Sequence, residues 1–125
     1  RPEDDKKYPL VTSINVDLAC EVVQQILDEN NIHINSFLRM NLNAVEPQQK
    51  IVSSVPHVDH PFPHKNFLIY FTNAGGKTYL GNESHDPKED DVIFFESNHL
   101  EDQQYYHWHD TPKEKRRVAL VATFI

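Results

Sequence analysis

The sequence predicts a mainly β domain, a sandwich or barrel of short strands preceded by one helix. From residue 37 onward, apolar residues recur with a period of two, which is the period of a β-strand. Turn-forming residues separate these short segments, and this pattern is typical of sandwiches and barrels. The length of 125 residues fits a single domain, expected to span residues 1–125, with the β core at about residues 36–125.

Residues 16–30 are predicted to form the helix. Asn15 or Asp17 can cap its start, and Asn30 and Asn31 suit its end. The apolar residues that follow the i, i+3, i+4 spacing of an amphipathic helix are Leu18, Ala19, Val22, Val23, Ile26 and Leu27.

Short strands are expected at residues 37–42, 51–58, 66–72, 77–80, 91–95 and 117–125. A turn at residues 73–76 (NAGG) joins two of them. Residues 81–91 and 97–114 are expected to be long polar loops. Long loops on a compact β scaffold commonly carry function.

Composition excludes several classes of protein. The chain has 12 Lys and Arg against 19 Asp and Glu, a net charge of −7, which disfavours binding to nucleic acid or to anionic membranes. A single cysteine, Cys20, excludes an internal disulfide and any multi-cysteine metal site. No apolar run approaches the roughly 18 residues that a membrane span needs. The first ten residues lack the features of a signal peptide, so we expect a cytoplasmic protein.

Histidine is the residue type that indicates a site, because the chain contains eight of them. His57 and Asp59 are two residues apart, so in a strand their side chains emerge on the same face. Two adjacent metal ligands need this arrangement, and the tail offers a third ligand in His107 or His109. Two histidines and one carboxylate form the facial triad of non-haem Fe(II) oxygenases, which leaves coordination positions open.

The last predicted strand begins with an arginine. In strand phase, Arg117 shares a face with the smaller side chains Ala119, Val121 and Thr123. A guanidinium at the mouth of such a face suits a carboxylate, because its planar fork binds both oxygens. Arg116 points the other way and is expected to be a solvated cation.

These residues, in this order, resemble the Fe(II)/2-oxoglutarate-dependent oxygenases. The shared pattern is H-x-D, a distal histidine and, ten residues later, an arginine that opens the terminal strand. The sequence is similar to the small prolyl-hydroxylase-like members, including compact ones from marine phages and bacteria. HVDHPFPHKNFLIYFTNAGGKTYL resembles their first metal strand, the next strand and its turn, and VIFFESN resembles the apolar strand before the distal histidine.

The resemblance implies a double-stranded β-helix, or jelly-roll, with the N-terminal helix packed on the major sheet. It implies that His57, Asp59 and His107 bind Fe(II), which 2-oxoglutarate chelates through its C1 carboxylate and C2 keto group. The C5 carboxylate would pair with Arg117, and oxygen would be the co-substrate. Many relatives hold 2-oxoglutarate by a tyrosine hydroxyl, which makes Tyr70 a candidate, although a core aromatic is the other interpretation.

The distal ligand has three candidates. In the family a proline often follows the distal histidine after four positions, and the arginine follows after nine or ten. From His107 the offsets to Pro112 and Arg117 are five and ten, whereas from His109 they are three and eight. We therefore choose His107, with His109 as the alternative ligand. His99 is the third candidate if the long stretch ESNHLEDQQYYHWH is not an insertion.

Other polar residues have weaker claims. Arg39 and Asn41 lie on the polar face of an early strand and line either the pocket or a solvated face. His60 and His64 are expected to be loop or substrate-side groups rather than ligands. The remaining candidates are His33 and His85, expected at the surface, and Trp108, Tyr105 and Tyr106, which form a substrate wall or anchor the loop.

The expected function is therefore an Fe(II)/2-oxoglutarate-dependent dioxygenase, an oxidoreductase that hydroxylates a peptide side chain or a small molecule and releases succinate and CO2. One alternative is a non-catalytic jelly-roll module that binds a metal, because the same triad accepts other metal ions. A second alternative is a structural β domain with surface histidines. Arg117 favours the enzyme, since a simple metal-binding module needs no partner for a carboxylate.

Overall fold

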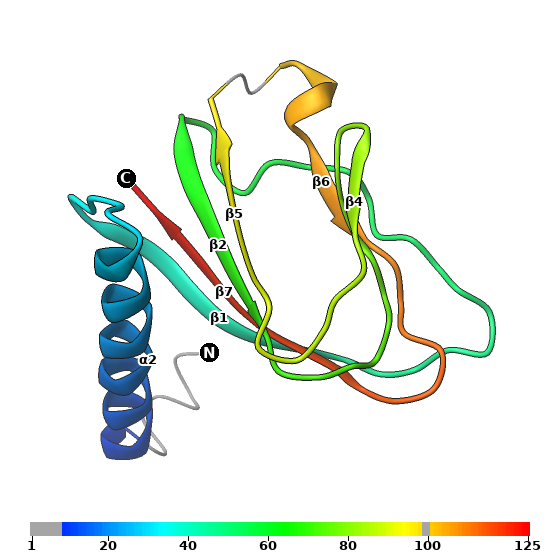
Figure 1. Cartoon of the computed structure of the whole chain (residues 1–125), viewed down its shortest axis with the longest axis horizontal. Helices are drawn as coiled ribbons and strands as arrows, with labels where there is room; N and C mark the ends of the chain where they lie inside the picture. Colours follow the sequence, from blue (N-terminus) through cyan, green and yellow to red (C-terminus); the bar gives the residue numbers. More distant parts are fainter. Residues whose placement is uncertain (1–8, 99–100) are drawn as a thin grey trace. The chain divides into compact units, whose positions relative to one another are not determined.

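The computed structural model describes residues 9–98 and 101–125, with side chains from residue 18 onward (Figure 1). Within these residues the protein is mainly β, with seven strands, one α-helix and one 3₁₀ helix, η1 (Gln103–Tyr105). The chain divides into a helical unit that ends at Asn35 and a β unit, Ser36–Ile125. The mainly β class predicted from the sequence is confirmed.

Helix α2 (Pro9–Glu29) begins seven residues before the predicted start. Proline is well suited to the first helical turn, because the N–H that it lacks has no partner there. The helix ends as expected: the Asn30 side chain donates to the Ile26 carbonyl at 2.7 Å, and Asn31 adopts a left-handed φ of 58°. Packing of the helix on the major sheet stays a prediction. No helix in the described part of the chain is long and apolar enough to cross a membrane.

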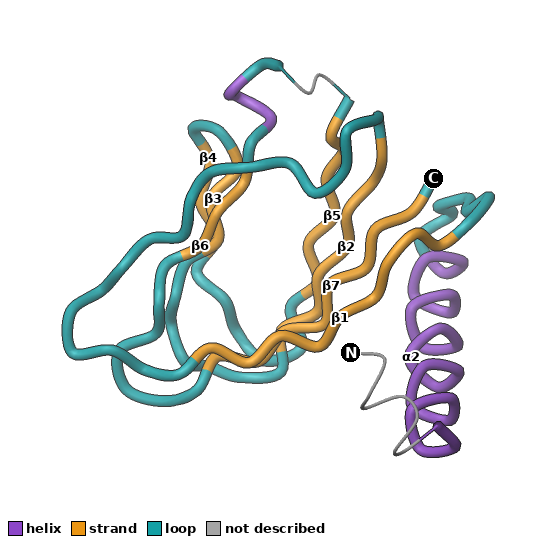
Figure 2. Tube along the Cα trace, turned by 180° about the vertical axis from the view of Figure 1, so that it is seen from behind, coloured by secondary structure: helices purple, strands orange, loops and turns teal. Residues whose placement is uncertain are grey.

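The larger sheet has four antiparallel strands in the order β1-β7-β2-β5. Their bounds are β1 (Phe37–Val45), β7 (Arg117–Phe124), β2 (His64–Tyr70) and β5 (Val92–Ser97). The smaller sheet is also antiparallel and has the order β4-β3-β6. Its strands are β4 (Glu83–His85), β3 (Thr78–Leu80) and β6 (His107–His109). Figure 2 shows the three short strands gathered opposite the four long ones, as in a β-sandwich.

The apolar core of the β unit lies on the inner face of the larger sheet. Leu68 of β2 is paired in register with Val121 of β7 and with Ile93 of β5. Leu80 of the smaller sheet also packs against this core, so the two sheets meet through apolar side chains. The buried members are Leu68, Tyr70, Phe95 and Ala119.

The strand predicted at residues 51–58 is wrong. This segment is irregular and forms no continuous ladder with β6 and its extension, to which it is joined by two isolated bridges, Ser53 with Asp110 and His57 with His107. Pro56 lacks an N–H and interrupts the ladder. The apolar residues of the segment do not form a buried face either, since Val55 is 78% exposed. The other five predicted strands are present, with ends shifted by up to three residues.

Two strands, β4 and β6, lie inside the predicted polar loops and were missed. Each has three residues, too few to show a period of two. The hairpin between β3 and β4 does have a sequence signal, because Gly81 and Asn82 form a two-residue connection. Gly81 has a φ of +56°, and glycine at the first position is typical of the type II′ hairpin turn.

Candidate metal centre and anion site

A backbone pair holds two histidines side by side. His57 donates its N–H to the His107 carbonyl at 3.1 Å, and His107 donates back to the His57 carbonyl at 3.0 Å. Residues that exchange both hydrogen bonds lie directly opposite each other, with their side chains on the same side. The two imidazole rings accordingly lie with centroids 4.5 Å apart.

Asp59 completes a cluster with these histidines. Its Oδ1 lies 3.4 Å from His57 Nε2, and its Oδ2 lies 3.4 Å from His107 Nε2. One ligand atom from each of the three residues lies within 4.8 Å of the others. We call these three residues the His–Asp–His cluster. The structure thus brings together the three residues that the sequence analysis chose as metal ligands.

The donor atoms of the cluster suit a divalent cation. The Val55 carbonyl lies 2.7 Å from His57 Nδ1 and accepts its proton, so the Nε2 lone pair faces the Asp59 carboxylate. Two acceptors that face each other are both satisfied by a cation between them. Asp59 Oδ2 is buried and has no hydrogen-bond partner among the described residues. Two imidazole nitrogens and one carboxylate oxygen are ligands that iron and its neighbours prefer.

His107 lacks the outer partner that a metal-binding histidine usually has. Its Nδ1 is buried and has no hydrogen-bond partner among the described residues. Its ring instead packs against the ring of Phe95, with centroids 5.2 Å apart. Aromatic packing and the backbone pair with His57 therefore orient this imidazole, rather than a hydrogen bond.

The Asp59 carboxylate stays ionised. Burial acts to raise its pKa, because the side chain is only 9% exposed. The interaction with His107, followed by the charges of Arg39 and His57, outweighs burial and holds the pKa well below its usual range. An ionised carboxylate is therefore ready to bind a cation at any physiological pH.

Arg39 of β1 extends the cluster on one side. Its Nη2 lies 2.9 Å from Asp59 Oδ1, in an ion pair with the cluster's only carboxylate. The sequence analysis left Arg39 open between the pocket and a solvated strand face. The structure places it at the pocket, where its side chain is 43% exposed.

Arg117 is buried without an acidic partner. The residue is only 4% exposed, and none of the described acidic side chains lies within ion-pair distance of it. Its Nε donates to the Gly76 carbonyl at 2.9 Å, and its Nη2 donates to Thr78 Oγ1 at 2.8 Å. Burial lowers the pKa of the guanidinium. A buried cation of this kind is normally paired, so the site has a place for an anion.

The ring of Tyr70 packs against the guanidinium of Arg117. Its ring centroid lies 5.3 Å from the guanidinium carbon of Arg117, and its hydroxyl contacts Thr78 Oγ1 at 2.5 Å. Burial is the main cause that raises the pKa of this phenol, which therefore stays neutral. Tyr70 does not line the cavity described below, so it positions Arg117 through Thr78 and through its ring.

One cavity joins the His–Asp–His cluster to Arg117. It has a volume of about 420 Å³, and both groups line it. Apolar side chains of Leu68, Phe95 and Val121 form its wall between them. Arg117 and Val121 both line the cavity, as expected for residues that share one face of the last strand.

His109 also lines the cavity but lies outside the cluster. Its Nδ1 is 3.4 Å from Ser54 Oγ, and its backbone N–H donates to the same hydroxyl at 3.0 Å. Burial, followed by the charge of Arg117, lowers the pKa of this imidazole, so it is neutral at physiological pH. The structure thus brings His107, and not His109, to His57. His99 lies outside the described residues.

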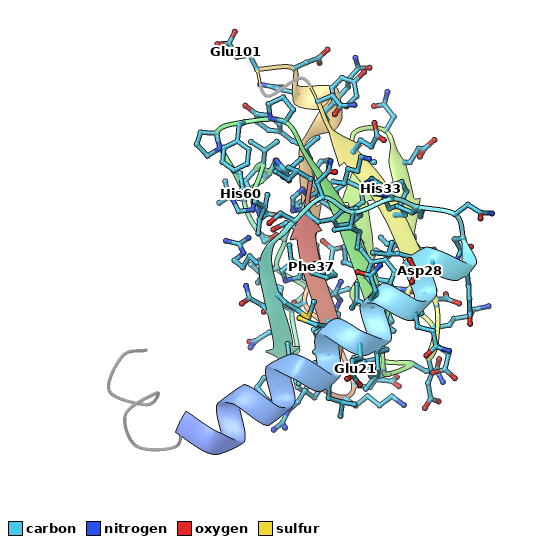
Figure 3. All side chains as sticks on the ribbon, turned by 90° about the vertical axis from the view of Figure 1, so that its left-hand side faces the viewer. Glu21, Asp28, His33, Phe37, His60 and Glu101 are labelled. Atoms are coloured by element: carbon cyan, nitrogen blue, oxygen red, sulfur yellow. The ribbon has the colours of Figure 1, made fainter. Side chains whose placement is uncertain are left out.

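The other histidines have different surroundings. His60 lies in the proline-bearing segment before β2, and its Nε2 is 2.8 Å from Thr123 Oγ1 (Figure 3). His64 is buried at the start of β2, with Nδ1 2.8 Å from the Phe62 carbonyl. Neither belongs to the cluster. Outside it are also His33, near Asn35, and His85, which contacts Asp91.

The remaining candidates lie outside the His–Asp–His cluster, and Trp108 lines the same cavity. Arg116 is exposed and pairs with Glu46, as expected for a solvated cation. Trp108 stacks on Tyr79 across the smaller sheet, with ring centroids 5.2 Å apart. Tyr105 ends helix η1, and Tyr106 follows it.

The residues that accept hydrogen bonds from Arg117 were not predicted from the sequence. Thr78 and the carbonyl of Gly76 accept its hydrogen bonds. Gly76 has a φ of +76°, and a Cβ there would lie 2.8 Å from Arg117 Cδ. The pair of glycines in NAGG is the available signal, because consecutive glycines mark places where backbone and side chain approach closely.

Comparison with known proteins gives no relative: no family model matches the sequence, and no curated protein matches it.

Metal affinity should separate the two histidines of β6. His107→Ala removes one of three converging ligand atoms and should weaken Fe(II) binding by about 100-fold or more. His109→Ala is the matched control and should change the affinity by less than about threefold, because this ring lies outside the cluster. Anaerobic calorimetric titration of metal-free protein measures both. A larger loss in His109→Ala would contradict the arrangement.

Gly76 should be less replaceable than Gly75. Both glycines have a positive φ, +76° and +74°, so alanine is strained to a similar degree at either position. At Gly76 the new methyl group also meets the Asp110 carbonyl and Arg117, whereas at Gly75 nothing lies within 4 Å. Gly76→Ala should therefore lower the free energy of unfolding by about 1–3 kcal/mol more than Gly75→Ala. Urea denaturation measures the difference, and equal losses would be inconsistent with this account.

Proposed function

We propose that the protein is an Fe(II)/2-oxoglutarate-dependent oxygenase that hydroxylates its substrate. One observation carries the proposal: a cavity of about 420 Å³ holds the His–Asp–His cluster and also a buried arginine that has no acidic partner among the described residues. A cation site and an anion site in one cavity match a metal ion and a ligand that chelates it while carrying a distant carboxylate.

The strand order supports a double-stranded β-helix for this proposal. If the bridged segment 51–58 is taken as a second, irregular strand, the β unit has eight consecutive segments. The first pairs with the eighth, the second with the seventh, the third with the sixth and the fourth with the fifth. A long hairpin with this pairing, wrapped into two sheets, is a jelly-roll.

Three side chains would hold the metal. They are His57 through Nε2, His107 through Nε2 and Asp59 through Oδ2, the carboxylate oxygen that Arg39 does not occupy. Bound Fe(II) and 2-oxoglutarate supply the oxidising chemistry, in which one atom of O2 enters a C–H bond of the substrate and the other enters succinate as CO2 leaves. A triad of this kind leaves the coordination positions that such chemistry needs.

Arg117 would bind the C5 carboxylate of 2-oxoglutarate. The guanidinium is held in place before the ligand arrives, because Gly76 and Thr78 each accept one of its hydrogen bonds. Only two of the five N–H groups of a guanidinium are used in these bonds. The carboxylate would supply the missing negative charge, and the apolar wall of the cavity would strengthen the pair by excluding water.

Anaerobic titration of metal-free protein with Fe(II) and then 2-oxoglutarate tests the proposal. Chelation by the keto acid should produce a weak visible charge-transfer band. His57→Ala should abolish the band because it removes a metal ligand. Arg117→Ala should keep Fe(II) binding but weaken 2-oxoglutarate by about 30-fold or more, since it removes a buried charged partner.

Arg116→Ala is the matched control for the charge of the chain. Arg116 is exposed and paired with Glu46, so its removal should leave the titration unchanged. Tight Fe(II) binding without a band would overturn the oxygenase and favour a metal-binding module. Absence of Fe(II) binding would overturn the metal centre itself.

A further inference from the structure

The cavity is positively charged although the chain is acidic. Its lining contains two arginines, Arg39 and Arg117, and three histidines, but one carboxylate, Asp59, among the described residues. The chain as a whole has seven more acidic than basic side chains. A concentration of positive charge inside an acidic protein indicates a cavity built for anions.

The charge remaining in the loaded site points to the substrate; this step rests on the proposed function. Fe(II) brings two positive charges to the cavity, and 2-oxoglutarate brings two negative ones. Asp59 and the C1 carboxylate would offset the two charges of Fe(II), and the C5 carboxylate would offset one arginine, which leaves one positive charge without a partner. Because Arg117 would be paired with the C5 carboxylate, the unpaired charge would be that of Arg39. A cation in a partly dry cavity favours a ligand that carries one negative charge.

Arg39 is placed to meet such a ligand. Its Nη2 contacts Oδ1 of Asp59, whereas Oδ2 is the oxygen that faces His107. Its side chain is 43% exposed, so a ligand can reach the rest of the guanidinium. Arg39 lies on β1, opposite Thr123, whereas Arg117 is opposite Val45 at the other end of the same strand pair. The two arginines therefore lie at opposite ends of the cavity face.

Amide side chains continue the row from Arg39. Asn41 and Asn43 follow it at two-residue intervals on β1, and all three line the cavity. Asparagine offers both a donor and an acceptor, so this row can bind the polar groups beside a carboxylate. The cavity volume, about 420 Å³, is near the lower end for ligand pockets and would be shared with 2-oxoglutarate, which limits the substrate to a small molecule.

We propose that Arg39 binds the carboxylate of a small-molecule substrate, such as a free amino acid or another small monocarboxylic acid. The ion pair with Asp59 holds Arg39 at the mouth of the site until that acid arrives. The acid then shares the guanidinium and is held next to the metal position. Arg39 is thus a specificity-determining residue for the proposed reaction.

The test compares acids with their matched amides. Protein is loaded with Zn(II), which is diamagnetic, and with 2-oxoglutarate. Binding of small monocarboxylic acids, the proteinogenic amino acids among them, is measured by ligand-observed saturation-transfer NMR against the corresponding primary amides. At least one acid should bind about tenfold or more tightly than its amide, because the amide lacks the charge that Arg39 recognises.

Variants assign this preference to Arg39. Arg39→Ala should weaken the bound acid by about 10- to 100-fold and remove the preference for acid over amide. Arg39→Gln serves as a second variant that keeps the length of the side chain, and it should behave in the same way. Arg116→Ala, the matched control, should retain the preference because this arginine lies outside the cavity.

Several results would overturn the inference. They are binding of no acid, equal binding of acids and amides, an unchanged preference in both Arg39 variants, or tighter binding of peptides with free C-termini than of any small acid. Calorimetry on the same samples separates this failure from failure of the proposed function. If Zn(II) and 2-oxoglutarate bind the wild-type protein, only the assignment of Arg39 is lost. If they do not bind, the metal centre fails and this inference fails with it.

Discussion

Two backbone hydrogen bonds between His57 and His107 determine the rest of the site. They join an irregular segment to a three-residue strand, and a second bridge, Ser53 with Asp110, supports the same register. The same two segments are also tied by Ser54, which binds His109. A slip of one residue would replace His107 by Trp108 opposite His57 and would dismantle the cluster. Pro56 lacks an N–H and lies between the two bridges, so no continuous ladder forms there.

One cavity contains two largely buried charges of opposite sign, the carboxylate of Asp59 and the guanidinium of Arg117. Asp59 is largely buried between Arg39 and two imidazoles, whereas Arg117 is buried with none of the described carboxylates within ion-pair distance. Neither arrangement is the most stable choice for the protein alone, because buried charges are costly unless they are paired. Both become favourable when a ligand carries the complementary charges, which is why we connect this geometry with binding and not with stability.

Most of the strands and most residues of the candidate site could be predicted from the sequence. The remaining residues depend on tertiary contacts, which a sequence pattern does not contain. Parity along the last strand placed Arg117 on the cavity face, and H-x-D identified His57 and Asp59. Parity could not decide between His107 and His109, because residues two apart share a face; register with His57 distinguishes them. The sequence also left the role of Arg39 open, because its ion pair with Asp59 joins segments that only the tertiary fold brings together.

Metal binding at the His–Asp–His cluster can be tested directly. Crystals grown anaerobically with Fe(II) and 2-oxoglutarate, measured at the iron absorption edge, should give one anomalous peak bound by Nε2 of His57, Nε2 of His107 and Oδ2 of Asp59. The other end of the keto acid should meet Arg117. A peak at another set of residues, such as His60 with His64, or no peak at saturating Fe(II), would contradict the account.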